Sequence, residues 1–294
     1  MDLPQQLFNG IFLGSIYALF ALGYTLVFGV LDVLNLAHAA VFTVGACMAL
    51  VLVARLGLPA WLGVVGASLG AGLLGLLLDR VAFAPLRGRP EERFAGLISS
   101  LAMASLFIAF VQGLFGPNAY VFPPDAVTID ALRIAGARLP IVQLVVIGVS
   151  LALMAGLGWL VQRTRFGRSL RAVAENPRAA ALLGIDVARV NAETFFISSA
   201  LGGVAGALFA LAFDSVSFDM GTSVELKGLA VIIVGGMGSL LGAFVGGLVL
   251  GLAEVLAIAG IGSTWRDAVA FGLLFLILIV RPAGLFGRTG TRRD

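Results

Sequence analysis

The sequence predicts an all-α polytopic membrane protein that forms a single transmembrane domain over residues 1–294. Apolar residues make up 60% of the chain and charged residues only 12%, whereas about a quarter of the residues are charged in soluble domains. The mean hydropathy is +1.06, and the apolar residues gather in runs long enough to cross a bilayer as helices. We therefore expect about eight transmembrane segments, with broken or re-entrant helices near residues 32–38 and 235–239.

The first apolar run, residues 7–31, is followed by a short polar break and a second apolar run, residues 39–53. Asn35 and His38 lie in this break. Asn35 could simply cap the second helix, or the break could line a site, because polar groups at membrane depth are costly and gather along pathways. Both interpretations stay open, and we place Asn35, His38 and Gly45 on a candidate pathway through the membrane.

Three further runs complete the first half, at residues 61–83, 94–115 and 140–160. The connection at residues 84–93 carries three arginines and two prolines, so the excess of positive charge in cytoplasmic loops places it inside the cell. The connection at residues 116–139 has two acids and two arginines and is expected outside.

Residues 163–192 form a polar segment between two apolar halves, with six arginines against two acids. This charge excess predicts a cytoplasmic loop. Within it, Asn176 suits a helix N-cap, Pro177 suits the first helical position, and Gly184 can end the helix in the left-handed conformation. The sequence thus predicts a helix of about two turns, which is too short to be stable without further contacts.

The short helix carries an apolar face formed by Ala179, Leu182 and Leu183. This face either packs back against the protein's own membrane helices or is offered to a cytoplasmic partner. We favour the partner, because the segment should otherwise be in water.

The second half continues with runs at residues 193–213, 227–258 and 267–280, and residues 214–225 are expected to form an external loop. The run at 227–258 contains a glycine-rich stretch in which each glycine weakens a continuous helix by up to about 1 kcal/mol relative to alanine. A break is one interpretation, and close helix packing through the spaced Gly238, Gly242 and Gly246 is the other.

Charge counting favours the break. The chain is outside after residue 213 and its arginine-rich tail should be inside, which requires an odd number of crossings although two apolar runs remain. We infer that the run at 227–258 is bent or re-entrant, and we add four residues of the bend to the candidate pathway: Gly235, Gly236, Gly238 and Ser239. By the same reasoning, the N-terminus is outside if both of the first two runs cross and inside if one is re-entrant.

Several chemistries are not supported by the sequence. Cys47 is the single cysteine and His38 the single histidine, so no metal site, cofactor or enzymatic nucleophile is predicted. No basic stripe indicates nucleic-acid binding, and no phosphate-binding loop surrounds Lys227, the single lysine. Glu254 and Asp267 could couple transport to an ion, but we prefer to interpret them as interfacial residues that face headgroups or water.

Three blocks of sequence resemble one family of membrane proteins. They are GSIYALFALGYTLVFGVLDVLNLAHAAVFTVGA at 14–46, GRSLRAVAENPRAAALLGIDVARV at 167–190 and VGGMGSLLGAFVGGLVLGLAE at 234–254. In this order they resemble the LivH-type permease subunits of bacterial ABC importers for branched-chain amino acids. One departure is that the family commonly has Asn-Phe-Ala-His-Gly where this chain has Asn35-Leu36-Ala37-His38-Ala39.

The resemblance implies a non-enzymatic, multi-pass permease of the cell inner membrane, surrounded by the lipid bilayer. Its implied partners are a second, LivM-like permease, two cytoplasmic ATPase subunits and a periplasmic substrate-binding protein. It also implies that the segment at 163–192 is the coupling loop, in which the ATPases would contact Arg171, Glu175, Asn176, Ala179, Leu182, Leu183 and Gly184. Two alternatives remain: a permease for urea or short amides in the same importer class, and an ion-coupled secondary carrier in which His38 or Glu254 titrates.

Overall fold

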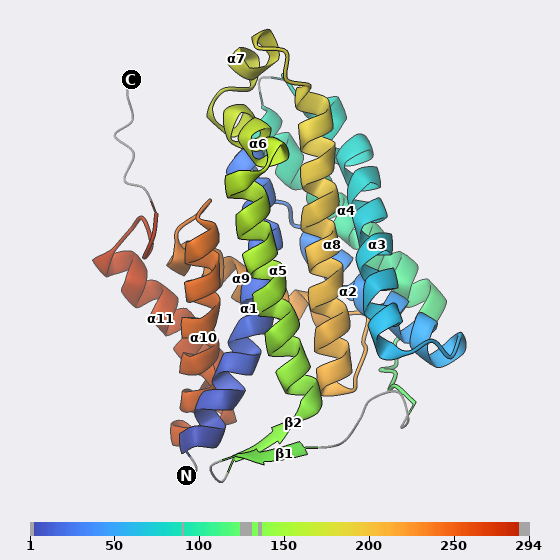
Figure 1. The fold of residues 1–294 in the computed structure, drawn as a ribbon, viewed down its shortest axis with the longest axis vertical. Coiled ribbons are helices and arrows are strands. Elements are labelled where there is room, and N and C mark those ends of the chain that lie inside the picture. Colours follow the sequence, from blue (N-terminus) through green and yellow to red (C-terminus); the bar gives the residue numbers. More distant parts are fainter. Residues whose placement is uncertain (1–2, 90, 124–130, 135–136, 288–294) are drawn as a thin grey trace.

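The computed structural model describes residues 3–89, 91–123, 131–134 and 137–287, and these residues form a bundle of long helices (Figure 1). The first half contains α1 (Leu3–Leu31), α2 (His38–Leu50), α3 (Ala60–Leu78), α4 (Glu92–Phe115) and α5 (Ile141–Arg163). The second half contains α6 (Arg165–Glu175), α7 (Pro177–Leu182), α8 (Val187–Phe213), α9 (Met220–Gly235), α10 (Leu240–Ile261) and α11 (Arg266–Val280).

Among the described residues, eight helical stretches are long and apolar enough to cross a membrane, which confirms the predicted class. Two of them are longer than their α-helical parts, because α2 continues as a π-helical turn to Arg55 and α3 continues through irregular turns to Leu86. The predicted loop at 116–139 also contains a feature that we did not expect. An antiparallel pair of strands, β1 (Ala131–Ile134) and β2 (Ala137–Pro140), leads into α5.

The central helix of the bundle is α1. It packs against α5, α8, α9 and α10, and every residue from Phe12 to Val27 is buried. By contrast, α3, α4, α5 and α11 expose large apolar side chains such as Leu69, Phe110 and Phe275. A belt of exposed apolar side chains on outer helices is what a lipid-facing surface requires.

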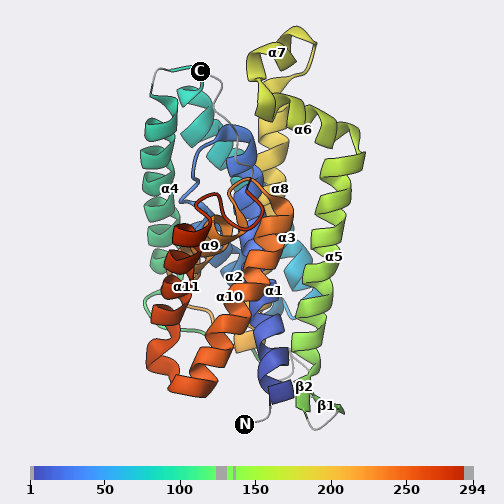
Figure 2. The same ribbon diagram turned by 90° about the vertical axis from the view of Figure 1, so that its left-hand side faces the viewer.

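The two ends of the bundle differ in charge. Helices α6 and α7 and the α3–α4 connection lie at one end, and the start of α1 and the β1–β2 hairpin lie at the other (Figures 1 and 2). The first end carries the arginine-rich segments, so the charge rule places it in the cytoplasm. Because α1 and α2 both run the length of a span, the N-terminus is then outside, which resolves the alternative left open by the sequence.

The break between α1 and α2 is confirmed. Asp32 adopts a left-handed conformation with φ of 52° directly after α1, and α2 starts only at His38. The Asn35 side chain accepts a hydrogen bond from the Ala37 amide at 3.2 Å, and the Leu36 amide donates to Ser100 Oγ of α4 at 3.1 Å. The non-helical backbone is therefore held by polar side chains inside the protein, as the membrane interior demands.

The break near residues 235–239 is also confirmed. Gly236 and Gly238 have φ of 101° and 82°, and Ser239 caps α10 by accepting from the Gly242 amide at 3.0 Å. The last carbonyls of α9 are satisfied by the chain after α11, because the Leu285 amide donates to Val234 at 2.8 Å. Close packing through glycine is present as well, since a Cβ on Gly246 would lie 2.7 Å from the Val231 carbonyl oxygen of α9.

The break changes the boundaries predicted for the second half. Residues 220–225, expected in an external loop, form the first turns of α9, so that part of the prediction was wrong. Helices α9 and α10 pack against each other around the break, so the run at 227–258 makes no net crossing. The first turn of α9 lies inside the bundle, where the Gly221 amide donates to Thr43 Oγ1 of α2 at 3.1 Å. Helix α10 then runs to the outer end, where its connection to α11 lies (Figure 2). The single crossing of α11 then gives the odd number that the charges require.

Candidate functional site

The cytoplasmic end presents α6 and α7, which project beyond the bundle (Figure 1). The sequence reasoning did not predict α6, although Thr164 is a good N-cap and accepts from the Gly167 amide at 3.1 Å. Leu170 and Val173 bury one face of α6, and the exposed Arg171 donates back to the Val161 carbonyl of α5. This helix is thus a bracket that fixes α7 to the end of α5.

The short helix α7 ends where the sequence indicated. Asn176 Oδ1 accepts from the Ala179 amide at 3.0 Å, and Gly184 has φ of 83°. Leu182 and Leu183 are 89% and 81% exposed, so they do not pack back on the protein's own helices. Ala180 instead makes the inward contact. Glu175, Asn176, Ala179 and Gly184 are exposed beside the two leucines.

The last residues of the predicted polar segment are helical. Residues 187–192 form the first turns of α8, which Asp186 caps by accepting from the Arg189 amide at 3.0 Å. The bounds of the cytoplasmic segment, residues 163–192, stay a prediction.

His38 lies in an aromatic cage in the middle of the bundle. Its side chain has no solvent exposure, its Nε2 is 3.2 Å from the Phe20 carbonyl oxygen, and its ring centroid is 4.8 Å from that of Phe20 and 5.4 Å from that of Tyr24. Asn35 is likewise buried. Through these contacts, both residues stabilise the break between α1 and α2.

The predicted pathway glycines make close backbone contacts. Gly45 faces Gly203 of α8, Gly235 faces Gly242 of α10, and Gly236 faces the chain after α11. Gly238 lies against Gly29 of α1, and Ser239 is a cap. None of the seven predicted pathway residues lines the open cleft between α9 and α11. Their pathway role stays a prediction.

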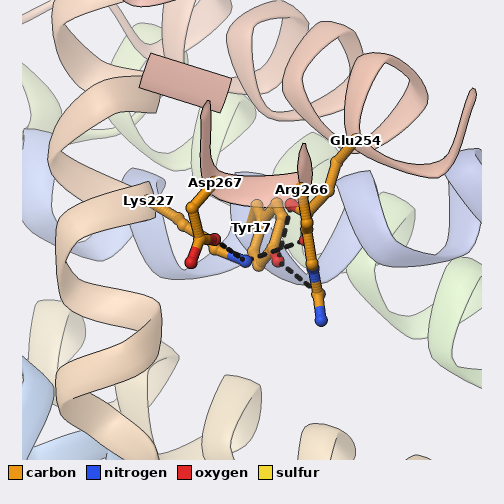
Figure 3. Close-up of polar contacts among 5 residues, drawn as sticks. All are labelled: Tyr17, Lys227, Glu254, Arg266 and Asp267. Carbon is orange, nitrogen blue, oxygen red and sulfur yellow. Dashed lines mark hydrogen bonds and ion pairs between the residues drawn. The ribbon is translucent and has the colours of Figure 1, made fainter. Parts of the chain in front are cut away.

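A charged cluster connects the four helices α1, α9, α10 and α11 (Figure 3). Glu254 of α10 has no solvent exposure and accepts from Lys227 Nζ of α9 at 2.8 Å and from the Tyr17 hydroxyl of α1 at 3.0 Å. Arg266 of α11 forms a further ion pair with Glu254. The interpretation of Glu254 as an interfacial residue that faces water was therefore wrong.

Asp267 completes the cluster from the solvent side. Its Oδ1 is 3.3 Å from Lys227 Nζ, and its side chain is 68% exposed. The cluster was not predicted from the sequence, because Lys227 was considered only as a candidate lysine of a phosphate-binding loop and was rejected in that role. A lone lysine in an apolar run, with an acid 27 residues later, was the available signal, because charges inside a membrane segment are retained only when paired or functional.

The cluster forms one wall of an open cleft between the first turns of α9 and α11. The cleft has a volume of about 450 Å³ and is lined by Thr222, Ser223, Leu226, Lys227, Arg266, Asp267 and Phe271. This volume lies within the range of small-molecule sites, roughly 300–1,000 Å³. The lining combines cations, an acid, hydroxyls and apolar side chains.

This chain is similar to known proteins over nearly all of its length. Residues 6–278 match the family described as branched-chain amino acid transport system / permease component. The chain belongs to this family. It is accordingly a transport permease and not an enzyme, and the resemblance stated from the three sequence blocks is confirmed.

The alignments with individual relatives cover almost all of this chain and almost all of each relative. The high-affinity branched-chain amino acid transport system permease protein LivH of Salmonella typhimurium is 35% identical over 97% of this chain and 95% of its own length. BraD of Pseudomonas aeruginosa, with the same description, gives the same identity and coverage. The probable LivH of Methanocaldococcus jannaschii is 29% identical over 97% of this chain and 94% of its own length. A multi-pass protein of the bacterial inner membrane follows from the relatives and the eight spans together.

Proposed function

We propose that this chain is the permease subunit of an ATP-driven importer for branched-chain or related small neutral amino acids. The proposed complex contains a second, LivM-like permease, two cytoplasmic ATPase subunits and a periplasmic substrate-binding protein. The substrate class follows that in the names of the relatives, which are branched-chain amino acid permeases.

One observation supports the ATPase partner. The exposed Leu182 and Leu183 form an apolar knob on α7 at the arginine-rich end of the molecule. Two adjacent leucines fully in water are unfavourable unless a partner covers them, since burying a leucine side chain contributes about 1.5–3 kcal/mol. Helix α6 connects this knob rigidly to α5 and so transmits force to it. Helix α5 continues to the outer end of the bundle.

Exchanging both leucines tests the proposal. In the double variant Leu182→Asp/Leu183→Asp, we expect normal insertion, loss of ATPase copurification and loss of leucine uptake, because two carboxylates cannot be buried in an apolar contact. The matched control is Ala119→Asp, which adds a carboxylate at an exposed position after α4, at the opposite end of the molecule, and should copurify with the ATPases. Unchanged copurification and uptake in the double variant would contradict the docking role.

The alternatives differ in their energy source and their solute. Uptake into proteoliposomes that hold this chain alone, driven by a proton or sodium gradient and indifferent to ATP, would identify a secondary carrier instead. Inhibition of leucine uptake by valine and isoleucine but not by urea or acetamide is the result expected for the amino-acid importer.

A further inference from the structure

The cleft between α9 and α11 contains both charges needed to recognise a zwitterion. Lys227 and Arg266 are cationic and Asp267 is anionic, and all three line the same space. We propose that this cleft is a binding site for the amino-acid backbone on the outer side of the permease, with the carboxylate on Lys227 and the ammonium on Asp267. The inference rests on the proposed function, because it assigns the recognition of that substrate to particular residues.

The ion pairs in the cluster are unequal, which makes one of them exchangeable. Glu254 is fully buried and held by Lys227, Arg266 and Tyr17, so it is a fixed counter-ion. The Lys227–Asp267 pair is longer, at 3.3 Å, and its acid is exposed. Lys227 is buried, whereas the Asp267 carboxylate can remain in water on its own. A substrate carboxylate can therefore replace Asp267 at Lys227 without leaving a buried charge unpaired.

The exchange is balanced in charge. Lys227 and Arg266 offset Glu254 and Asp267, so the cluster is neutral when empty. When the substrate carboxylate takes the place of the Asp267 carboxylate on Lys227, the released Asp267 faces the substrate ammonium. The zwitterion is itself neutral, so the occupied cluster is neutral as well, which is the arrangement that costs least near the membrane interior.

The remaining lining fits the rest of an aliphatic amino acid. The side chains of Leu226 and Phe271 are partly exposed into the cleft and offer an apolar surface to a branched side chain. Thr222 and Ser223 stand in the first turn of α9, where the positive end of the helix dipole favours a carboxylate. Helix α11 starts at the outer end of the bundle, beside its connection to α10 (Figure 2), and Arg266 and Asp267 of its first turn line the cleft. A solute released outside can therefore reach these two residues.

Ligand analogues and one conservative variant test the site. The complex of the permeases and ATPases, without the substrate-binding protein, is placed in nanodiscs of phosphatidylglycerol, which carries no ammonium group, and binding is followed by saturation-transfer NMR. L-leucine should give a signal, whereas leucinamide, which lacks the carboxylate, and 4-methylpentanoate, which lacks the ammonium, should give much weaker ones. Asp267→Asn should weaken leucine binding about tenfold, the expected loss of one charge-assisted hydrogen bond. It should not weaken the binding of 4-methylpentanoate, which has no ammonium group and competes with Asp267 for Lys227.

The control variant is Asp32→Asn, which makes the same change in an exposed ion pair with Arg93 outside the cleft, and it should bind leucine normally. ATP-driven leucine uptake by the wild-type importer is measured first. Absence of uptake would refute the proposed function itself. If uptake is present, the site is refuted by equal signals from all three ligands, by no leucine signal, or by unchanged leucine binding and uptake in Asp267→Asn.

Discussion

His38 occupies a space that two glycines of neighbouring helices leave free. A Cβ on Gly23 of α1 would lie 2.7 Å from His38 Cε1, and one on Gly202 of α8 would lie 2.8 Å from the same atom. The imidazole therefore fills the junction of α1, α2 and α8, at the point where the chain enters α2. At the scale of single residues, His38, which the sequence suggested for a pathway, packs against the helices on both sides of the break.

This packing gives a residue-scale prediction. Gly23→Ala should destabilise the protein by about 1–3 kcal/mol, because the added methyl group overpacks a filled core. Gly113→Ala is the matched control, since a Cβ there meets no atom within 4 Å. Thermal unfolding of the purified protein in detergent measures both changes.

The double variant Gly23→Ala/His38→Ala separates overpacking from other effects. Removing the imidazole frees space for the new methyl group, so the two changes should be less than additive. Full additivity would show that Gly23 does not serve to accommodate His38.

At the scale of elements, the breaks were predictable and their partners were not. Helix-breaking signals are local, because Asn35 lies in the first break and Gly236, Gly238 and Ser239 form the second. The start of α9 at Met220 was missed because its first turns contain Thr222, Ser223 and Glu225, which suggest a loop until tertiary contacts are known. Lys227 and Glu254 meet only because α9 folds back against α10, and no local pattern specifies that contact.

The second break also gives an element-scale prediction. Gly236→Ala should destabilise the protein more than Gly184→Ala, although both residues have positive φ. A Cβ on Gly236 would lie 2.7 Å from Gly287 Cα, whereas one on Gly184 meets nothing within 4 Å. Gly184→Ala therefore carries only the backbone strain, about 1–2 kcal/mol, and Gly236→Ala also displaces the chain that caps α9. Equal unfolding temperatures for the two variants would contradict this account.

At the scale of the whole molecule, the arginine distribution and the helix arrangement specify one orientation. The arginine-rich connections lie at the end that carries α6 and α7, and the β1–β2 hairpin lies at the other (Figure 2). The positions of the arginines along the sequence predicted which connections lie inside the cell, because this prediction does not depend on which helices are in contact. The side of the N-terminus additionally required the lengths of α1 and α2. The knob on α7 and the cleft beside α11 are thereby assigned to opposite sides of the membrane, as an importer that receives solute outside and force inside requires.

Cysteine labelling tests this orientation directly. Cys47 is buried, so Cys47→Ser provides a background for single cysteines at exposed positions. Ala181→Cys on α7 should react with a membrane-impermeant maleimide only after the inner membrane is opened, whereas Leu132→Cys on β1 should react from the periplasm in spheroplasts. Leucine uptake by each variant controls for correct insertion. The reverse labelling pattern would place the α7 knob outside the cell, where a cytoplasmic ATPase cannot reach it, and would refute both the docking role of α7 and the outward position of the cleft.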